Sequence, residues 1–121
     1  MAVKGVDISE FNGAVDFQAL KNAGVQFVII RCGFGSDYPG QQDKRFEENI
    51  QKAEAAGMPW GVYHYSYATN KQGGVDEANH CLRLLKGRKP LYGVWLDMED
   101  NSTLGGDLAG AAQGFCNTIE G

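Results

Sequence analysis

The chain has 121 residues, of which 43% are hydrophobic and 21% charged, enough for one compact domain with a single core. Its net charge is -4 and its Lys and Arg residues are scattered, which argues against nucleic acid as a partner, because phosphate binding needs a concentrated basic face. No apolar stretch approaches the roughly 20 residues that span a bilayer, so membrane insertion is not expected either.

Short apolar runs alternate with amphipathic stretches along the chain. Residues 3–8 form the first apolar run, which contains Asp7 near its end. Asp16 can cap a helix whose apolar face continues to Gly24. Residues 27–30 are continuously apolar, as in a strand buried on both faces. Residues 33–40 are rich in glycine and aromatic residues and are predicted to form a loop.

The second half repeats this alternation. Helical spacing of apolar residues predicts three more helices, and apolar runs predict two more strands. The predicted elements are a helix around 46–53, a strand at 60–67, a helix around 75–85, a strand at 91–97 and a helix around 108–119. The order β-α-β-α-β-α-β-α predicts an α/β fold with a parallel sheet. Two architectures fit it: a small open doubly wound sheet, or the first half of a barrel.

Chemistry in both architectures gathers at the carboxyl ends of the strands. The candidate positions are therefore Asp7, residues 31–34, residues 63–67 and residues 97–99. Most of these strand ends carry groups that perform acid–base chemistry or bind sugars, which favours an enzyme.

The last strand end is acidic. Asp97 and Glu99 are two residues apart, so in an extended segment they project to the same side, while Asp100 projects away. Two adjacent carboxylates resist ionising together, so the pKa of one rises, as glycoside hydrolysis requires. An acidic loop, solvated or bound to Mg²⁺ or Ca²⁺, is the alternative. For Asp7 the alternative is a turn formed with Ser9.

Tyr63, Tyr65 and Tyr67 alternate along the third predicted strand and share one side. Aromatic rings suit the apolar faces of sugars, although ordinary core packing explains each tyrosine equally well. His64 faces the other way and is expected to be a buried histidine with satisfied hydrogen bonds.

The cysteines indicate a reducing compartment. Three are present, and none belongs to a Cys-x-x-Cys motif or a Cys/His cluster. All three are expected to be buried free thiols: Cys32, Cys81 and Cys116.

Several short motifs follow one another in order. They are Gly5-Val6-Asp7-Ile8-Ser9 with Asn12-Gly13, residues 24–31, Gly61-Val62-Tyr63-His64-Tyr65, and Leu96-Asp97-Met98-Glu99-Asp100. This ordered set resembles the family 25 glycoside hydrolases, the Chalaropsis-type lysozymes of bacteria, phages and some fungi.

The resemblance implies an N-acetylmuramidase that cleaves the β-1,4 bond between N-acetylmuramic acid and N-acetylglucosamine in peptidoglycan, with no metal or cofactor. It implies Glu99 as general acid/base, and Asp97 as the group that orients the acetamido group of the substrate in a substrate-assisted, retaining mechanism. Asp7 would line the same pocket. The sugar contacts would come from Tyr63, Tyr65, Arg31 and Phe34.

The family fold is an irregular TIM-like barrel with more strands than residues 1–121 supply. We therefore expect an incomplete catalytic domain of about four β/α units. A missing C-terminal segment or a second copy in a homodimer would complete it. Two other hypotheses are a non-catalytic remnant that binds glycan or a partner, and a chitinase-like hydrolase of acetamido sugars.

The N-terminus lacks the apolar segment of a secretory signal. We expect synthesis in the cytoplasm of a bacterial or phage-infected cell and, as for an endolysin, action on the cell wall after release.

Overall fold

The computed structural model describes residues 4–35, 39–100 and 105–120. Residue 3 of the first predicted strand and residues 36–38 of the predicted loop lie outside them. The strands are β1 (Gly5–Ile8), β2 (Phe27–Phe34), β3 (Trp60–Tyr65) and β4 (Val94–Asp97). The helices are α1 (Phe17–Asn22), α2 (Phe46–Ala55), α3 (Lys71–Leu85) and α4 (Leu108–Glu120), with short 3-10 turns at Glu10–Asn12 and Pro39–Gln41. No helix in the described part of the chain is long and apolar enough to cross a membrane.

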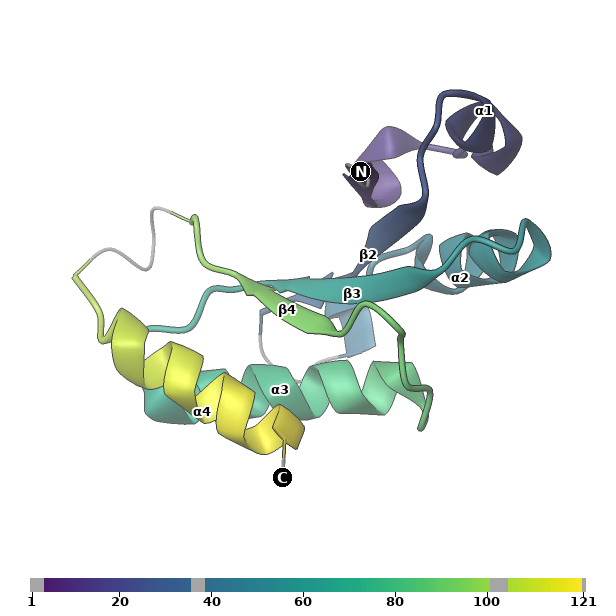
Figure 1. Cartoon of the computed structure of the whole chain (residues 1–121). Helices are drawn as coiled ribbons and strands as arrows, with labels where there is room; N and C mark the ends of the chain where they lie inside the picture. The colour runs from purple at the N-terminus through teal and green to yellow at the C-terminus, as the bar shows by residue number, and fades with distance from the viewer. Residues whose placement is uncertain (1–3, 36–38, 101–104, 121) are drawn as a thin grey trace.

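All four strands are parallel, and they lie side by side in the order β1-β2-β3-β4 (Figure 1). A doubly wound sheet reverses its direction of growth partway, whereas this sheet grows in one direction only. Right-handed crossovers in one direction place the connecting helices on one face. The sheet therefore has the topology of part of a barrel, and the open doubly wound alternative is excluded.

The core lies between the sheet and its helices. Alternate residues of β2 face it, so Val28, Ile30 and Cys32 are fully buried. Helix α2 contributes Phe46 and α4 contributes Phe115 to the same cluster. The opposite face of the sheet carries Asp7, Arg31, Tyr63 and Asp97, as the strand register places them.

Helices α3 and α4 pack closely under the sheet (Figure 1). Asn70 caps the start of α3, and its side chain accepts a hydrogen bond from the Gly73 backbone N–H at 2.8 Å. Gly74 permits the close approach, because a Cβ at this position would collide with the carbonyl oxygen of Ala111 on α4.

Four predicted strand boundaries are wrong. β1 starts at Gly5, so Lys4 lies outside the strand. β2 continues through Gly33 and Phe34, because a register shift after Arg31 lets the strand stay paired with β3. β3 ends at Tyr65 rather than at residue 67. β4 starts at Val94 rather than at residue 91, because a turn closed by the Gly93 N–H and the Pro90 carbonyl precedes it.

The prediction of three buried thiols is confirmed for two cysteines and wrong for the third. Cys32 and Cys81 are fully buried, with their sulfur atoms 3.4 Å apart. Cys116 is exposed, because α4 turns Ala111 and Phe115 toward the core and Cys116 away from it. His64 is buried as predicted, and its Nε2 lies 2.7 Å from the Gly35 carbonyl oxygen, to which it donates.

Candidate active site

The acidic residues of β1 and β4 meet on the open face of the sheet. Asp7, Asp97 and Glu99 line one hollow of about 350 Å³, together with Tyr63 of β3. We call it the acidic hollow. Asp100 does not line it, and its Oδ1 instead accepts a hydrogen bond from the Tyr65 hydroxyl at 3.2 Å. The structure therefore brings the three predicted carboxylates together.

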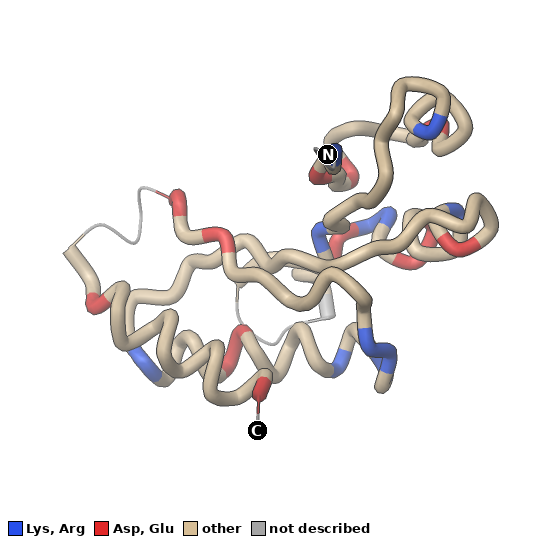
Figure 2. Tube along the Cα trace, viewed as in Figure 1, with Lys and Arg blue, Asp and Glu red and all other residues tan. Residues whose placement is uncertain are grey.

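The two ends of the strands differ in charge. Figure 2 shows acidic residues where β4 ends and basic residues in the loop that precedes β4. The carboxyl end of β4 is thus the acidic end of the strand, and the opposite end is basic.

Burial raises the pKa of Asp97 above its ordinary value of 3.8. The charge of Glu99, a hydrogen bond with Glu99 and the charge of Asp7 raise it further. Burial, reinforced by Asp7 and opposed by the cation of Arg31, also raises the pKa of Tyr63, to about 12. Tyr63 therefore remains a neutral hydrogen-bond donor beside a carboxyl group that keeps its proton to a higher pH than usual.

A buried carboxylate under the sheet holds the end of β3. Glu77 of α3 is 1% exposed, and it accepts hydrogen bonds from the Ser66 hydroxyl at 2.7 Å and the Tyr67 N–H at 2.8 Å. The Ser66 N–H in turn donates to the carbonyl oxygen of Asp97 at 2.8 Å. Glu77 is thereby linked through one residue to the backbone that carries Asp97. Glu77 was not among the residues predicted from the sequence, although a glutamate on the apolar face of a helix signals a buried partner.

The predicted sugar-binding residues divide between two hollows. Tyr63 lines the acidic hollow. The other three line a neighbouring hollow of about 610 Å³, which we call the aromatic hollow. Its lining residues are Glu10, Phe11, Arg31, Phe34, Gly40, Lys44, Tyr65 and Tyr67. Within it the Tyr67 ring packs against those of Tyr65 and Phe34, with centroids 5.4 Å and 6.3 Å away.

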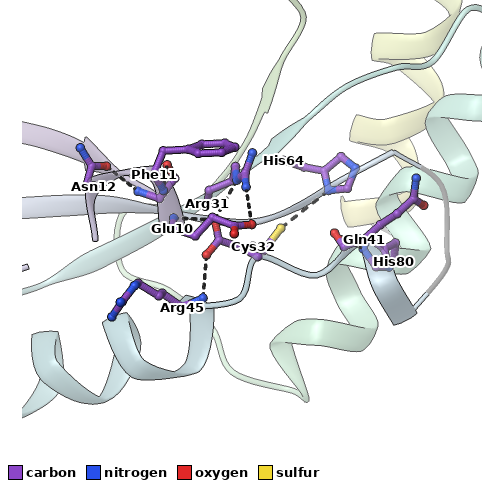
Figure 3. Close-up of polar contacts among 11 residues, drawn as sticks. Glu10, Phe11, Asn12, Arg31, Cys32, Gln41, Arg45, His64 and His80 are labelled. Atoms are coloured by element: carbon purple, nitrogen blue, oxygen red, sulfur yellow. Dashed lines mark hydrogen bonds and ion pairs between the residues drawn. The ribbon is translucent and has the colours of Figure 1, made fainter. Parts of the chain in front are cut away.

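Arg31 is bound by protein carboxylates. Its Nε donates to Asp43 Oδ2 at 2.8 Å, and its Nη2 donates to Glu10 Oε1 at 3.0 Å (Figure 3). Its guanidinium group also lies 4.8 Å from the centre of the Phe11 ring and 5.3 Å from that of Phe34. Arg31 therefore organises the wall of the aromatic hollow. Glu10 and Asp43 were not among the residues predicted from the sequence, although an arginine in a buried strand implies acidic partners.

Metal ligation was the alternative interpretation of the acidic strand end. Among the residues that the structure describes, no group of three or more His, Cys, Asp or Glu side chains is arranged to hold a metal ion.

The model of the family described as Glycosyl hydrolases family 25 matches residues 6–120. The chain belongs to this family. Its parallel sheet with sequential strand order is part of the TIM-like α/β barrel of family 25 lysozymes.

Known relatives and structures agree with this family. Lysozyme M1 of Streptomyces globisporus is 32% identical over 103 residues, which cover 82% of this chain and 33% of that protein. The catalytic domain of endolysin ply40 from bacteriophage P40 of Listeria monocytogenes is 30% identical, with a TM-score of 0.82 over 99% of this chain and 58% of that one. The modular autolysin LytC of Streptococcus pneumoniae, in complex with a synthetic peptidoglycan ligand, is 25% identical, with a TM-score of 0.82 over 98% and 30%. The chain thus spans one third of lysozyme M1 and a little over half of the ply40 domain.

Proposed function

We propose that this chain carries the catalytic carboxylates of a lysozyme that hydrolyses the β-1,4 bonds between N-acetylmuramic acid and N-acetylglucosamine in peptidoglycan. The observation that carries the proposal is the convergence of Asp7, Asp97 and Glu99 in one hollow at the carboxyl ends of parallel strands. The family and the lysozyme, endolysin and autolysin names of its relatives support the substrate class.

Glu99 and Asp97 take different roles in this proposal. Glu99 is exposed at the rim of the hollow, where it protonates the leaving glycosidic oxygen and later takes a proton from the attacking water. The acetamido oxygen of the substrate attacks the anomeric carbon. Asp97, more buried, accepts the acetamido N–H and steadies the positive charge that develops there. Neutral Tyr63 donates to a sugar oxygen.

The open face of the sheet leaves a large aromatic side chain exposed to solvent. Trp95 of β4 is 60% exposed on this face, beside Asp97. We infer that additional strands, from the rest of a longer polypeptide or from a second copy, complete the barrel on this side. The finished enzyme would act on peptidoglycan strands of the cell wall after release from the cytoplasm.

The release of reducing ends from purified peptidoglycan tests the proposal. We expect Glu99→Gln to lower the rate by about 10²–10⁴-fold, as for the loss of a general acid. Glu54→Gln, an equal change at an exposed site on α2, should leave it unchanged.

Three results would contradict the proposal. A Glu99→Gln variant as active as the parent would remove Glu99 from the mechanism. A monomeric chain that binds peptidoglycan without releasing reducing ends would favour a glycan-binding remnant. Hydrolysis of chitin but not of peptidoglycan would favour a chitinase-like enzyme.

A further inference from the structure

One cation that lines the aromatic hollow has no ion-pair partner in the described part of the chain. The described residues give Lys44 no ion pair, and it is exposed at the lining of the hollow. Arg31 differs, because it is already paired with the carboxylates of Glu10 and Asp43. Lys44 is therefore the cation available to a ligand in this hollow.

Two aromatic rings of the hollow are exposed to solvent. Phe11 is 83% exposed and Tyr67 is 43% exposed. Phe11 is nevertheless held in place, because it lies in a short turn that Ser9 and Asn12 close on each other: Asn12 Oδ1 accepts from the Ser9 N–H at 2.8 Å, and Ser9 Oγ accepts from the Phe11 N–H at 3.2 Å. The Arg31 guanidinium group lies against its ring (Figure 3). A ring that is both fixed and exposed suits the apolar face of a sugar.

The two hollows are lined by successive same-face residues of β3. Tyr63 lines the acidic hollow, and Tyr65, the next residue on the same face of the strand, lines the aromatic hollow. A polymer that is bound at the carboxylates and runs along β3 toward Tyr65 would therefore reach the aromatic hollow. An anionic substituent is repelled by Asp7, Asp97 and Glu99 and attracted by Lys44, so the charges favour one position of the polymer over the others.

We propose that the aromatic hollow is a second saccharide subsite that selects a sugar bearing a carboxylate. Phe11 and Tyr67 contact the sugar, and Lys44 pairs with the carboxylate. The inference rests on the proposed action on peptidoglycan. In that polymer the carboxylate belongs either to the lactyl group of muramic acid or to the peptide attached to it.

Binding to three defined glycans of equal length tests this subsite in a Glu99→Gln background, which prevents turnover. The first is a neutral chito-oligosaccharide, the second contains muramic acid with a free lactyl carboxylate, and the third carries the peptide on that group. We expect the two anionic glycans to bind more tightly than the neutral one, and the tighter of the two identifies the source of the carboxylate. Calorimetry or NMR titration at low ionic strength gives each Kd.

The variants separate the two contacts. Lys44→Ala should raise the Kd of the anionic glycans by about two- to fivefold, as for the loss of an exposed ion pair, and leave the Kd of the neutral glycan unchanged. Phe11→Ala should raise the Kd of all three glycans by about three- to tenfold, because it removes the aromatic ring that contacts the sugar. Lys89→Ala is the matched control, since this exposed lysine lies in the loop before β4, at the opposite end of the strands.

Two outcomes overturn the subsite. Unchanged anionic binding in Lys44→Ala, or tighter binding of the neutral glycan than of both anionic ones, excludes charge selection by Lys44. Unchanged binding in Phe11→Ala excludes the aromatic contact. A parent chain that binds none of the glycans contradicts the proposed function itself, so the two failures are distinguishable.

Discussion

Asp43 accepts a hydrogen bond from Arg31 Nε at 2.8 Å, and both side chains are buried. The same carboxylate accepts the backbone N–H groups of Glu10 at 3.0 Å and Arg45 at 2.9 Å. One buried acid therefore joins β2, the turn after β1 and the start of α2.

We expect Asp43→Asn to lower the free energy of unfolding by about 3 kcal/mol, because Arg31 loses one of its two charged partners in a buried site. Urea unfolding measures this loss. Glu54→Gln, at an exposed position, should change it by less than about 0.5 kcal/mol. A loss no larger for Asp43→Asn than for this control would show that Glu10 alone satisfies Arg31.

The raised pKa of Asp97 makes stability depend on pH in a defined direction. The folded state holds this proton more tightly than the unfolded state, so stability falls as the pH rises from the ordinary value of 3.8 through the raised pKa. Asp97→Asn removes this dependence. Thermal unfolding of the parent and of Asp97→Asn is compared over a pH series. As the pH rises through this window, we expect the Tm of the variant to increase relative to that of the parent. Above the window the difference in Tm should be constant. Parallel pH profiles would contradict the raised pKa.

The same shift predicts the acidic side of the activity profile. Asp97 must be ionised to accept the acetamido N–H in the proposed mechanism. Hydrolysis should therefore decline with falling pH sooner than an ordinary aspartate with a pKa of 3.8 would cause. A rate that stays constant down to this ordinary value would assign Asp97 another role.

Glu77 offers a test of how the end of β3 is held. Glu77→Ala leaves the Ser66 hydroxyl and the Tyr67 N–H without their acceptor, and we expect a loss of about 3 kcal/mol in the free energy of unfolding. Asp76→Ala, on the same helix with a side-chain contact to Gln72, should cost under about 1 kcal/mol. Equal losses for the two variants would mean that water replaces the Glu77 carboxylate.

The three thiols should differ in reactivity. Cys81, through a hydrogen bond with Cys32, and burial both raise the pKa of the Cys32 thiol, whereas Cys116 is exposed. Alkylation of the native protein should therefore modify Cys116 alone, and alkylation in denaturant should modify all three, as mass spectrometry can show. Rapid native labelling of Cys32 would contradict its burial.

The elements of the fold follow from local patterns in the sequence, but their boundaries depend on tertiary contacts. β2 reaches Phe34 because β3 is available to pair with it beyond the register shift, which no local pattern encodes. The choice between a barrel and a doubly wound sheet depends on which strands become neighbours, and both architectures share the same alternation of elements.

The site was predictable where strand periodicity governs it. The spacing of two residues places Asp97 and Glu99 together, and the carboxyl end of β1 adds Asp7. The partners of Arg31 and the role of Glu77 were not predictable in the same way, because their contacts join segments far apart in the sequence. The sequence indicates only that Arg31 and Glu77 are charged residues within apolar patterns and therefore require buried partners.

The strand order has a consequence for folding. Each strand pairs with the one synthesised just before it, so the sheet can grow in the order in which the ribosome delivers the chain. Asp7 emerges first but gains its acidic neighbours only when β4 docks. If the strands pair in this order, the repulsion among the carboxylates begins only after β1, β2 and β3 have paired.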